Sequence, residues 1–252
     1  AEYLIGEDPF SITTYKNPLQ ANPDISLTYW AYNEPNPDLV LANYGASYTF
    51  FMYLAEHYGG SSFIQDVVKR STDGIDSVEQ SLASFGYNPD FKELFRNWTI
   101  ANYLDNTTLE DGFYGYDNVT ITMSIEGSPY TNSAIPRTEN EVPYWGTDYL
   151  FFDLPSDTPF NLEFKGDDQA GYIVTVILSN TSSIPLVMPV DISTLGYGNF
   201  STEELGITAD EVTLVISSYT KGSTPNYNDT KTAPAQSYWF MMNPSGVTIS
   251  LG

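Results

Sequence analysis

Apolar positions in the first part of the chain recur at helical spacing. From Leu39 to Tyr58 they fall on nearly every face of a helix, which predicts a central, buried helix ended by Gly59-Gly60. A second stretch repeats apolar residues every three or four positions. It predicts a helix with a core-facing stripe of Phe91, Leu94, Phe95, Trp98 and Ala101.

Helix starts are marked by capping boxes, in which a polar residue is followed three positions later by Glu or Gln. Gly86 is expected to end the second of the helices that they start. Residues 1–6 are predicted to be a helix end stopped by Gly6, and residues 7–38 a long loop, because Pro, Asn and Asp interrupt them repeatedly. The three boxes are Ser62 with Gln65, Asp76 with Glu79, and Asp90 with Glu93.

Beyond Asn106 the pattern changes to short alternating runs rich in Val, Ile, Thr, Tyr and Phe, separated by turn residues. Such runs without helices between them predict an antiparallel β-sandwich, either immunoglobulin-like or jelly-roll-like. The expected strands are Val119–Ile125, Tyr149–Asp153, Phe160–Phe164, Tyr172–Leu178, Leu186–Val190, Val212–Tyr219, Ser237–Met242 and Val247–Leu251.

The predicted fold class is therefore α+β. An N-terminal α-helical subdomain is expected over residues 1–105, a linker over 106–116, and a β-sandwich domain over 117–252. A chain of 252 residues is long enough for two such parts, each with its own core.

Composition narrows the possible partners. The chain has 32 acidic and 9 basic residues and a formal charge of -23, so it repels phosphate backbones and nucleic acid is not expected as a partner. It has no cysteine, which excludes disulfides and thiolate metal sites. No apolar run approaches the ~20 residues that a membrane span requires.

Glycosylation sequons of the form Asn-x-Ser/Thr support an extracellular or cell-surface location with glycans as attached groups. Asn97 lies inside a predicted helix, so we expect it to be modified least. The better candidates lie at predicted loops or strand ends. The full set is Asn97, Asn106, Asn118, Asn180, Asn199 and Asn228.

Candidate catalytic chemistry is sparse. His57 is the only histidine, so an H-E-x-x-H zinc site cannot form within the chain, and a Ser-His-Asp triad would have to use this residue. Its place near a predicted helix end indicates a histidine favoured by the helix dipole. Asp167 and Asp168 are candidate calcium ligands, as is the segment Asp111–Asn118, although neither matches an EF-hand loop.

Two further possibilities remain open in the strand region. Pairs of acids could serve a glycosidase, although most such pairs are solvated turns. Exposed aromatic residues could form a sugar-stacking or partner surface, or they could belong to the sandwich core and its cross-strand pairs. The acid pairs are Glu7-Asp8, Asp167-Asp168 and Asp210-Glu211.

The helical half also resembles a known family. Asn43–Gly60 contains Tyr-Gly-Ala-Ser-Tyr, residues 74–75 are a Gly-Ile helix start, and Phe91–Asp105 carries Phe-x-x-Leu-Phe-x-x-Trp. These segments resemble secreted gluzincin-type zinc metallopeptidases of the hyicolysin-like and immune inhibitor A-like kinds. In those enzymes the block forms the helical half-domain beyond the zinc site, and a β-sandwich commonly follows. The likeness covers roughly residues 1–105.

The resemblance implies that the H-E-x-x-H helix and the glutamate ligand lie upstream of this block. Glu2 falls after the expected ligand position, so it is not assigned to zinc, which belongs to the full-length family. Tyr44 and Tyr48 would lie near the cleft, where they could stabilise an oxyanion or simply pack. The chain is then the C-terminal part of an extracellular peptidase-like protein, inactive alone, that shapes the cleft and binds a polypeptide substrate or the cell surface.

The alternative is a non-catalytic, glycosylated surface protein that serves as a surface-layer or filament subunit. Its partners would be neighbouring subunits. The residues encoded immediately before Ala1 separate the two hypotheses, because only the peptidase requires H-E-x-x-H followed by Asn-Glu-Gly.

Overall fold

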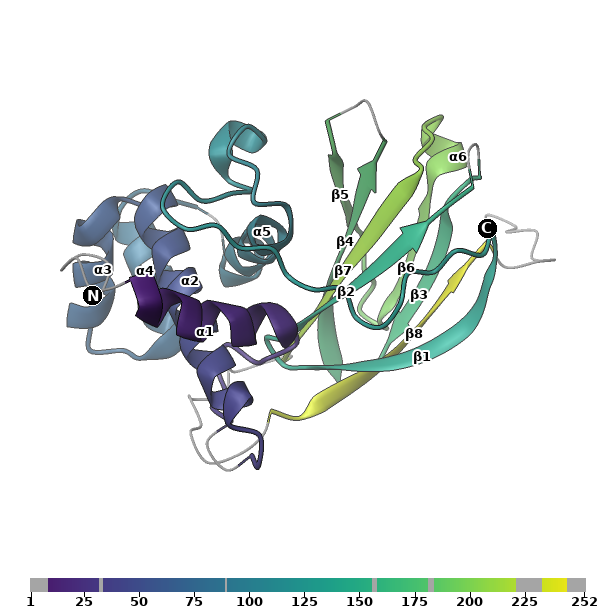
Figure 1. The fold of residues 1–252 in the computed structure, drawn as a ribbon. Helices are drawn as coiled ribbons and strands as arrows, with labels where there is room; N and C mark the ends of the chain where they lie inside the picture. Colours follow the sequence, from purple (N-terminus) through teal and green to yellow (C-terminus); the bar gives the residue numbers. More distant parts are fainter. Residues whose placement is uncertain are drawn as a thin grey trace. The chain divides into compact units, whose positions relative to one another are not determined.

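The computed structural model describes residues 9–31, 34–88, 90–155, 158–180, 184–220 and 233–243 (Figure 1). The predicted helix end at 1–6, the strand Val247–Leu251 and the sequon at Asn228 lie outside these residues. Helices precede strands along the chain, which confirms the α+β class. None of the described helices is long and apolar enough to cross a membrane.

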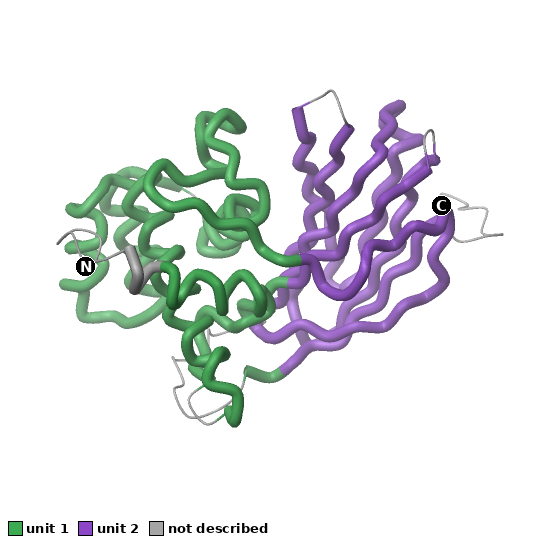
Figure 2. Tube along the Cα trace, in the orientation of Figure 1, with its two compact units in different colours: residues 1–124, 145–147, 222–234 green, residues 125–144, 148–221, 235–252 purple. Residues whose placement is uncertain are grey.

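The chain divides into two compact units (Figure 2). Unit 1 comprises Ala1–Ser124, Trp145–Thr147 and Gly222–Pro234, and unit 2 comprises Ile125–Tyr144, Asp148–Lys221 and Ala235–Gly252. Residues 106–116, predicted as a linker, therefore belong to unit 1.

The described part of unit 1 is helical, and its long helix α2 packs against both α1 and α3. Gly45 of α2 permits this close approach, because a Cβ there would lie 2.4 Å from the Tyr15 carbonyl oxygen and 2.8 Å from the Leu19 Cβ. The predicted central helix is thus confirmed. The helices are α1 (Pro9–Ala21), α2 (Pro37–His57), α3 (Gly60–Lys69), α4 (Gly74–Ser84) and α5 (Phe91–Leu104), followed by the short 3-10 turn η2 (Glu110–Gly112).

Helix α1 corrects the prediction of a loop over residues 7–38. The described part of this helix begins at Pro9. Pro18 lies inside the helix, yet the next residue, Leu19, is fully buried. Packing of α1 on α2 therefore outweighs the local breaking tendency of Pro and Asn.

Only one of the three predicted capping boxes is correct. The Asp90 carboxylate accepts a hydrogen bond from the Glu93 backbone N–H at 2.9 Å, at the start of α5. The boxes at Ser62 and Asp76 are wrong, because α3 and α4 begin earlier, after Gly59 and Asp73. Glycines with positive φ, Gly59 at 115° and Gly74 at 59°, make the turns that set these starts.

Unit 2 is a sandwich of two four-stranded sheets, ordered β1-β8-β3-β6 and β2-β7-β4-β5. Most strands lie in the sheet opposite to that of the strand before them. This strand order is that of an eight-stranded jelly roll, which is one of the two kinds of β-sandwich predicted from the sequence. The elements are β1 (Ile135–Pro143), β2 (Thr147–Asp153), β3 (Asn161–Gly166), β4 (Ala170–Ser179), β5 (Leu186–Val190), β6 (Tyr197–Ser201), the single helical turn α6 (Thr202–Leu205), β7 (Glu211–Thr220) and β8 (Ala235–Met242).

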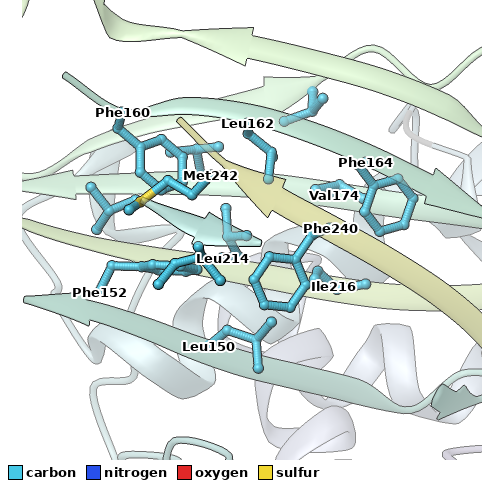
Figure 3. Packing of buried hydrophobic residues seen from close by; sticks show 14 of the residues in the cluster. Leu150, Phe152, Phe160, Leu162, Phe164, Val174, Leu214, Ile216, Phe240 and Met242 are labelled. Carbon is cyan, nitrogen blue, oxygen red and sulfur yellow. The ribbon is translucent and has the colours of Figure 1, made fainter. Parts of the chain in front are cut away.

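Inward-facing side chains fill the space between the two sheets (Figure 3). Along β3 burial alternates, so that Leu162 and Phe164 point inward. Phe152 meets Phe160 and Phe240 edge-on, with ring centroids 5.4 and 5.9 Å apart. Such aromatic pairs add about 0.5–1.5 kcal/mol each to the effect of burial.

The strand predicted at Val119–Ile125 is wrong, although its alternating burial is real. Its backbone bonds to helical unit 1 instead of to a sheet: Ile121 N–H donates to Asp105 and Met123 N–H donates to the Asn102 carbonyl. Two strands were missed, β1 and β6, which are the two edges of one sheet. Their inward positions include Thr138 and Asn140 in β1 and Gly198 in β6, so neither strand has a clear apolar alternation.

Candidate functional site

Side chains from four strands form a row on one surface of the sheet β1-β8-β3-β6. Strand pairing places Trp239 between Glu139 and Lys165, and Lys165 between Trp239 and Tyr197. Directly paired residues project from the same side of a sheet, and the neighbouring Phe240 is buried in the core. The row therefore lies on the side away from the core, which we call the outer face.

Two cations stack on the rings of this row. The Arg137 guanidinium carbon lies 4.8 Å from the centroid of the Trp239 ring, and Lys165 Nζ lies 4.9 Å from that of Tyr197. Such contacts contribute about 0.5–1 kcal/mol at exposed sites. Within the described residues of unit 2, these are the only Lys or Arg side chains. The cations of an otherwise acidic sandwich are thus gathered on one face.

A β-bulge helps to position Arg137. Between the pairs Ile135–Met242 and Thr138–Phe240, two residues of β1 stand opposite one residue of β8. A bulge bends its strand and changes the direction of a side chain. Edge strand β1 can accommodate this because its other side has no strand partner.

Carboxylates alternate with the cations. Glu139 accepts an ion-paired hydrogen bond from Arg137 at 2.9 Å, and Asp168 pairs with Lys165. Residues including Glu141, Asp167 and Ser237 complete an open hollow of about 600 Å³ in the outer face. The hollow therefore offers a planar guanidinium, an ammonium group, carboxylate acceptors and aromatic rings together.

The residues beneath the hollow are held firmly. A Cβ at Gly166 would lie 2.0 Å from the Tyr172 ring, so the backbone can pass there only as glycine. The Tyr172 hydroxyl donates to the Ser237 carbonyl at 2.8 Å, and burial raises its pKa to about 12. Tyr238 donates to Asp148 at 2.6 Å, and burial, with the Asp148 charge, raises the Tyr238 pKa well above its usual value.

The structure gives the predicted calcium ligands other partners. Asp168 pairs with Lys165, and the Asp167 carboxylate accepts from the Gln169 N–H at 2.7 Å. Among the described residues no group of three or more His, Asp or Glu side chains is arranged to hold a metal ion, and this covers Asp111–Asn118 as well. Calcium binding stays a prediction without support from this geometry.

Tyr44 and Tyr48, the cleft candidates, lie one turn apart on α2. Tyr44 is exposed and packs edge-on against Trp30, with ring centroids 4.9 Å apart, and also meets Tyr15. Tyr48 is partly buried. These contacts fit the packing role, and the oxyanion role stays untested.

His57 is the last residue of α2, as predicted, but its environment favours the neutral ring. Its Nε2 lies 3.1 Å from the Gly115 carbonyl oxygen, and its ring stacks on Phe113 at 5.0 Å. Burial lowers the pKa of His57, although Gly115 and the nearby Glu56 act in the opposite direction. Desolvation thus outweighs the expected stabilisation of a charged histidine by the helix end.

The sequons differ in how their side-chain amides are used. The Asn106 side-chain carbonyl accepts from both the N–H and the hydroxyl of Thr108, at 2.9 and 2.7 Å. The Asn118 amide donates to Glu56 at 2.9 Å, and that of Asn180 donates to the Thr208 carbonyl at 3.0 Å.

Two sequons lie within regular elements. Asn97 is partly buried on α5, which is consistent with the expectation that it is the sequon least modified by a glycan. Asn199 is exposed on β6, opposite Glu163 and two residues after Tyr197. Because residues two apart on a strand share a face, a glycan on Asn199 would project beside the row on the outer face.

No family model and no curated protein sequence matches the chain. The outer face is consequently interpreted from its own chemistry. Sequence reasoning had named the strand-region aromatics as a possible sugar-stacking surface, but it missed Arg137, Glu139 and Tyr197 because strands β1 and β6 were missed. The alternation Arg137-x-Glu139-x-Glu141, read as an edge strand, is the signal that could have found this face.

Proposed function

We propose that the chain is the binding portion of an extracellular zinc-metallopeptidase-like protein, and that the outer face of unit 2 holds carbohydrate on a substrate or cell surface. The row Glu139, Trp239, Lys165 and Tyr197 carries this proposal. Tyr197 is 51% exposed and Trp239 is partly buried on this face, and aromatic rings gathered on a surface away from the core favour a binding role.

The chemistry of the outer face suits a sugar ring. A pyranose presents an apolar C–H surface, which stacks on an aromatic ring, and edge hydroxyls, which both donate and accept hydrogen bonds. Trp239 and Tyr197 supply rings, Arg137 and Lys165 supply donors, and Glu139 supplies an acceptor. Specific ligand sites typically combine an apolar contact surface with a small number of polar groups that point toward the ligand.

Unit 1 takes the supporting role that the family resemblance implies. Helices α2 and α5 coincide with the Tyr-Gly-Ala-Ser-Tyr and Phe-x-x-Leu-Phe-x-x-Trp segments on which the resemblance rests. In this proposal residues upstream of Ala1 supply the zinc ligands, and unit 1 shapes one side of the cleft for a polypeptide substrate. This supports a scaffold and binding role, with no catalysis by this chain alone.

Retention on immobilised polysaccharides tests the binding role. We expect Trp239→Ala and Tyr197→Ala each to weaken binding by about fivefold or more, since truncating an aromatic residue that anchors a ligand costs about 1 kcal/mol or more. Leu205→Ala, an exposed change on α6, is the matched control and should bind normally. A folded Trp239→Ala variant with unchanged retention on every polysaccharide bound by the wild type would overturn the proposal.

The peptidase part has a separate test. Translation of the coding sequence before Ala1 should contain H-E-x-x-H followed by Asn-Glu-Gly, and the longer protein should lose proteolysis when a chelator removes zinc. A complete precursor without these residues would eliminate the peptidase and leave the carbohydrate-binding role standing.

The alternative of a surface-layer or filament subunit is favoured by a different observation. Ile184 and Leu195 in unit 2 are 72% and 61% exposed, and contact with a neighbouring subunit would remove this apolar surface from water. Sedimentation at rising concentration tests this alternative. Concentration-dependent assembly that Ile184→Ser abolishes would support it, and a monomer throughout would not.

A further inference from the structure

A cavity of about 640 Å³ lies within unit 1 and is unrelated to the outer face. Its walls are contributed by α2, α3, α4, α5 and the loop before α2, and the apolar lining consists of Leu27, Phe50, Phe51, Val67, Ile75, Val78 and Phe91. Its volume lies in the range of roughly 300–1,000 Å³ that is typical of small-molecule sites. A lining of this kind suits an apolar body.

The polar lining of this cavity is concentrated in one short segment. Asp73, Gly74 and Asp76, at the start of α4, all line the cavity, and Asp73 makes no side-chain cap bond to its own helix. Thr28 also lines it, and its hydroxyl oxygen is buried without a hydrogen-bond partner in the described structure. No Lys, Arg or His is among the lining residues.

The net charge at the start of α4 is found by comparing the charge of the helix N-terminus with that of the two aspartates. A helix N-terminus is equivalent to about +0.5 elementary charge, whereas two aspartates carry two full negative charges, so the sum at the start of α4 is negative. The faces of Phe50, Phe51 and Phe91 also attract a cation. Electrostatics therefore select a positively charged group, even though a helix start alone would select an anion.

We propose that this cavity binds a small hydrophobic amine, a molecule with an aliphatic or aromatic body and one protonated amino group. The body fills the space between the phenylalanine rings, and the ammonium group meets Asp73 and Asp76. The net charge of -23 raises the local concentration of such cations around the chain. The proposal does not depend on carbohydrate binding by unit 2.

A matched ligand series tests the proposal on the full chain at low salt. The probes are 2-phenylethylamine, 2-phenylethanol and phenylacetate, which share an aromatic body and differ in head group, measured by isothermal titration calorimetry. We expect the amine to bind about fivefold tighter than the alcohol, and phenylacetate to bind weakest, because exposed carboxylates give modest but additive attraction.

Variants separate the head group from the body. Asp76→Asn should reduce the advantage of the amine over the alcohol by about twofold, while Asp117→Asn, an exposed carboxylate outside the cavity, should leave it unchanged. Phe51→Ala removes a wall residue that is 39% exposed, so it should weaken all three probes without unfolding unit 1. Equal or tighter binding of phenylacetate, or no binding of the amine at millimolar concentration, would overturn the proposal.

Discussion

The two units use aromatic side chains in different ways. In unit 1 the rings of Tyr53, Phe95 and Trp98 are buried, and Phe95 packs on Trp98 while Tyr53 packs on Tyr116. In unit 2 the rings between the sheets are equally buried, but Trp239 and Tyr197 stand on the outer face against cations. A ring buried in a core is explained by packing, whereas the rings of Trp239 and Tyr197 lie against cations outside the core, where the proposed binding role would use them.

The units also differ in how far apart in sequence their neighbours lie. The apolar stripe of α5 comes from one helix of 14 residues. The outer face joins residues 137, 165, 197 and 239, which only strand register brings together. The first arrangement is local and follows from spacing. The second exists only once the sheet order is known.

The sharpest test of this comparison is a large-to-small change in each core. Phe95→Ala in unit 1 and Phe240→Ala in unit 2 remove rings that are fully buried. Each should cost about 3–5 kcal/mol, because the lost burial is added to the cost of a cavity. Hydrogen exchange followed by mass spectrometry of peptides from α5 and β8 reads the two units separately.

If the units are stabilised independently, each variant will accelerate exchange in its own unit only. Equal acceleration in both units by either variant would contradict the comparison and indicate one cooperative structure. Leu205→Ala, an exposed change, serves as the control for both.

The predictions from sequence succeeded for features that depend on local spacing and failed for features that depend on contacts between distant residues. Periodicity located α2, and the Asp90–Glu93 box located the start of α5, because these signals depend on neighbours within one turn. The other six strands were found because each is a short run rich in Val, Ile, Leu, Met or aromatic residues. Strands β1 and β6 were missed because Thr138, Asn140 and Gly198 take inward positions at which an apolar side chain would have marked a strand.

Other failures had tertiary causes. Helix α1 forms despite Pro18 because Leu19 is buried against α2. Residues 119–125 alternate in burial because they lie over helices, which imitates a strand pattern. The jelly-roll order, and with it the outer face, could not be deduced from local patterns, since several sheet orders share one pattern of alternation.

The next largest effect is expected beneath the outer face. Gly166→Ala would place a Cβ against the rigid Tyr172 ring, so it should cost about 1–3 kcal/mol and also weaken polysaccharide binding. Ser237→Ala, which changes a side chain on the same hollow without such a clash, should leave stability within about 0.5 kcal/mol of wild type. Denaturant unfolding measures the free energy of unfolding of both variants. A Gly166→Ala variant as stable as the wild type would show that the Tyr172 ring can move to make room for the added Cβ.

Helix capping in unit 1 provides a matched pair with a smaller effect. Asp90 accepts the Glu93 N–H and starts α5, whereas Asp73 precedes α4 without a cap bond. Asp90→Ala should therefore destabilise unit 1 by about 1 kcal/mol, and Asp73→Ala by much less. Equal losses in urea unfolding would mean that Asp73 does cap α4 in solution, and would weaken its assignment to the amine cavity.

The smallest expected effect is a pH dependence that separates the units, because the only histidine lies in unit 1. Burial lowers the pKa of His57, so the folded state binds its proton less readily than the unfolded state. The resulting stabilisation is present above the unfolded pKa of about 6.5 and is lost as the pH falls through the lower folded value. Exchange from α2 peptides should accelerate below pH 6.5 after correction for intrinsic rates, while β8 peptides do not change over the same interval. His57→Gln keeps a donor for the Gly115 carbonyl and cannot titrate, so it should remove this difference. Acceleration that persists in His57→Gln would assign the effect to carboxylates. Because both units contain carboxylates, pH dependence would then not distinguish unit 1 from unit 2.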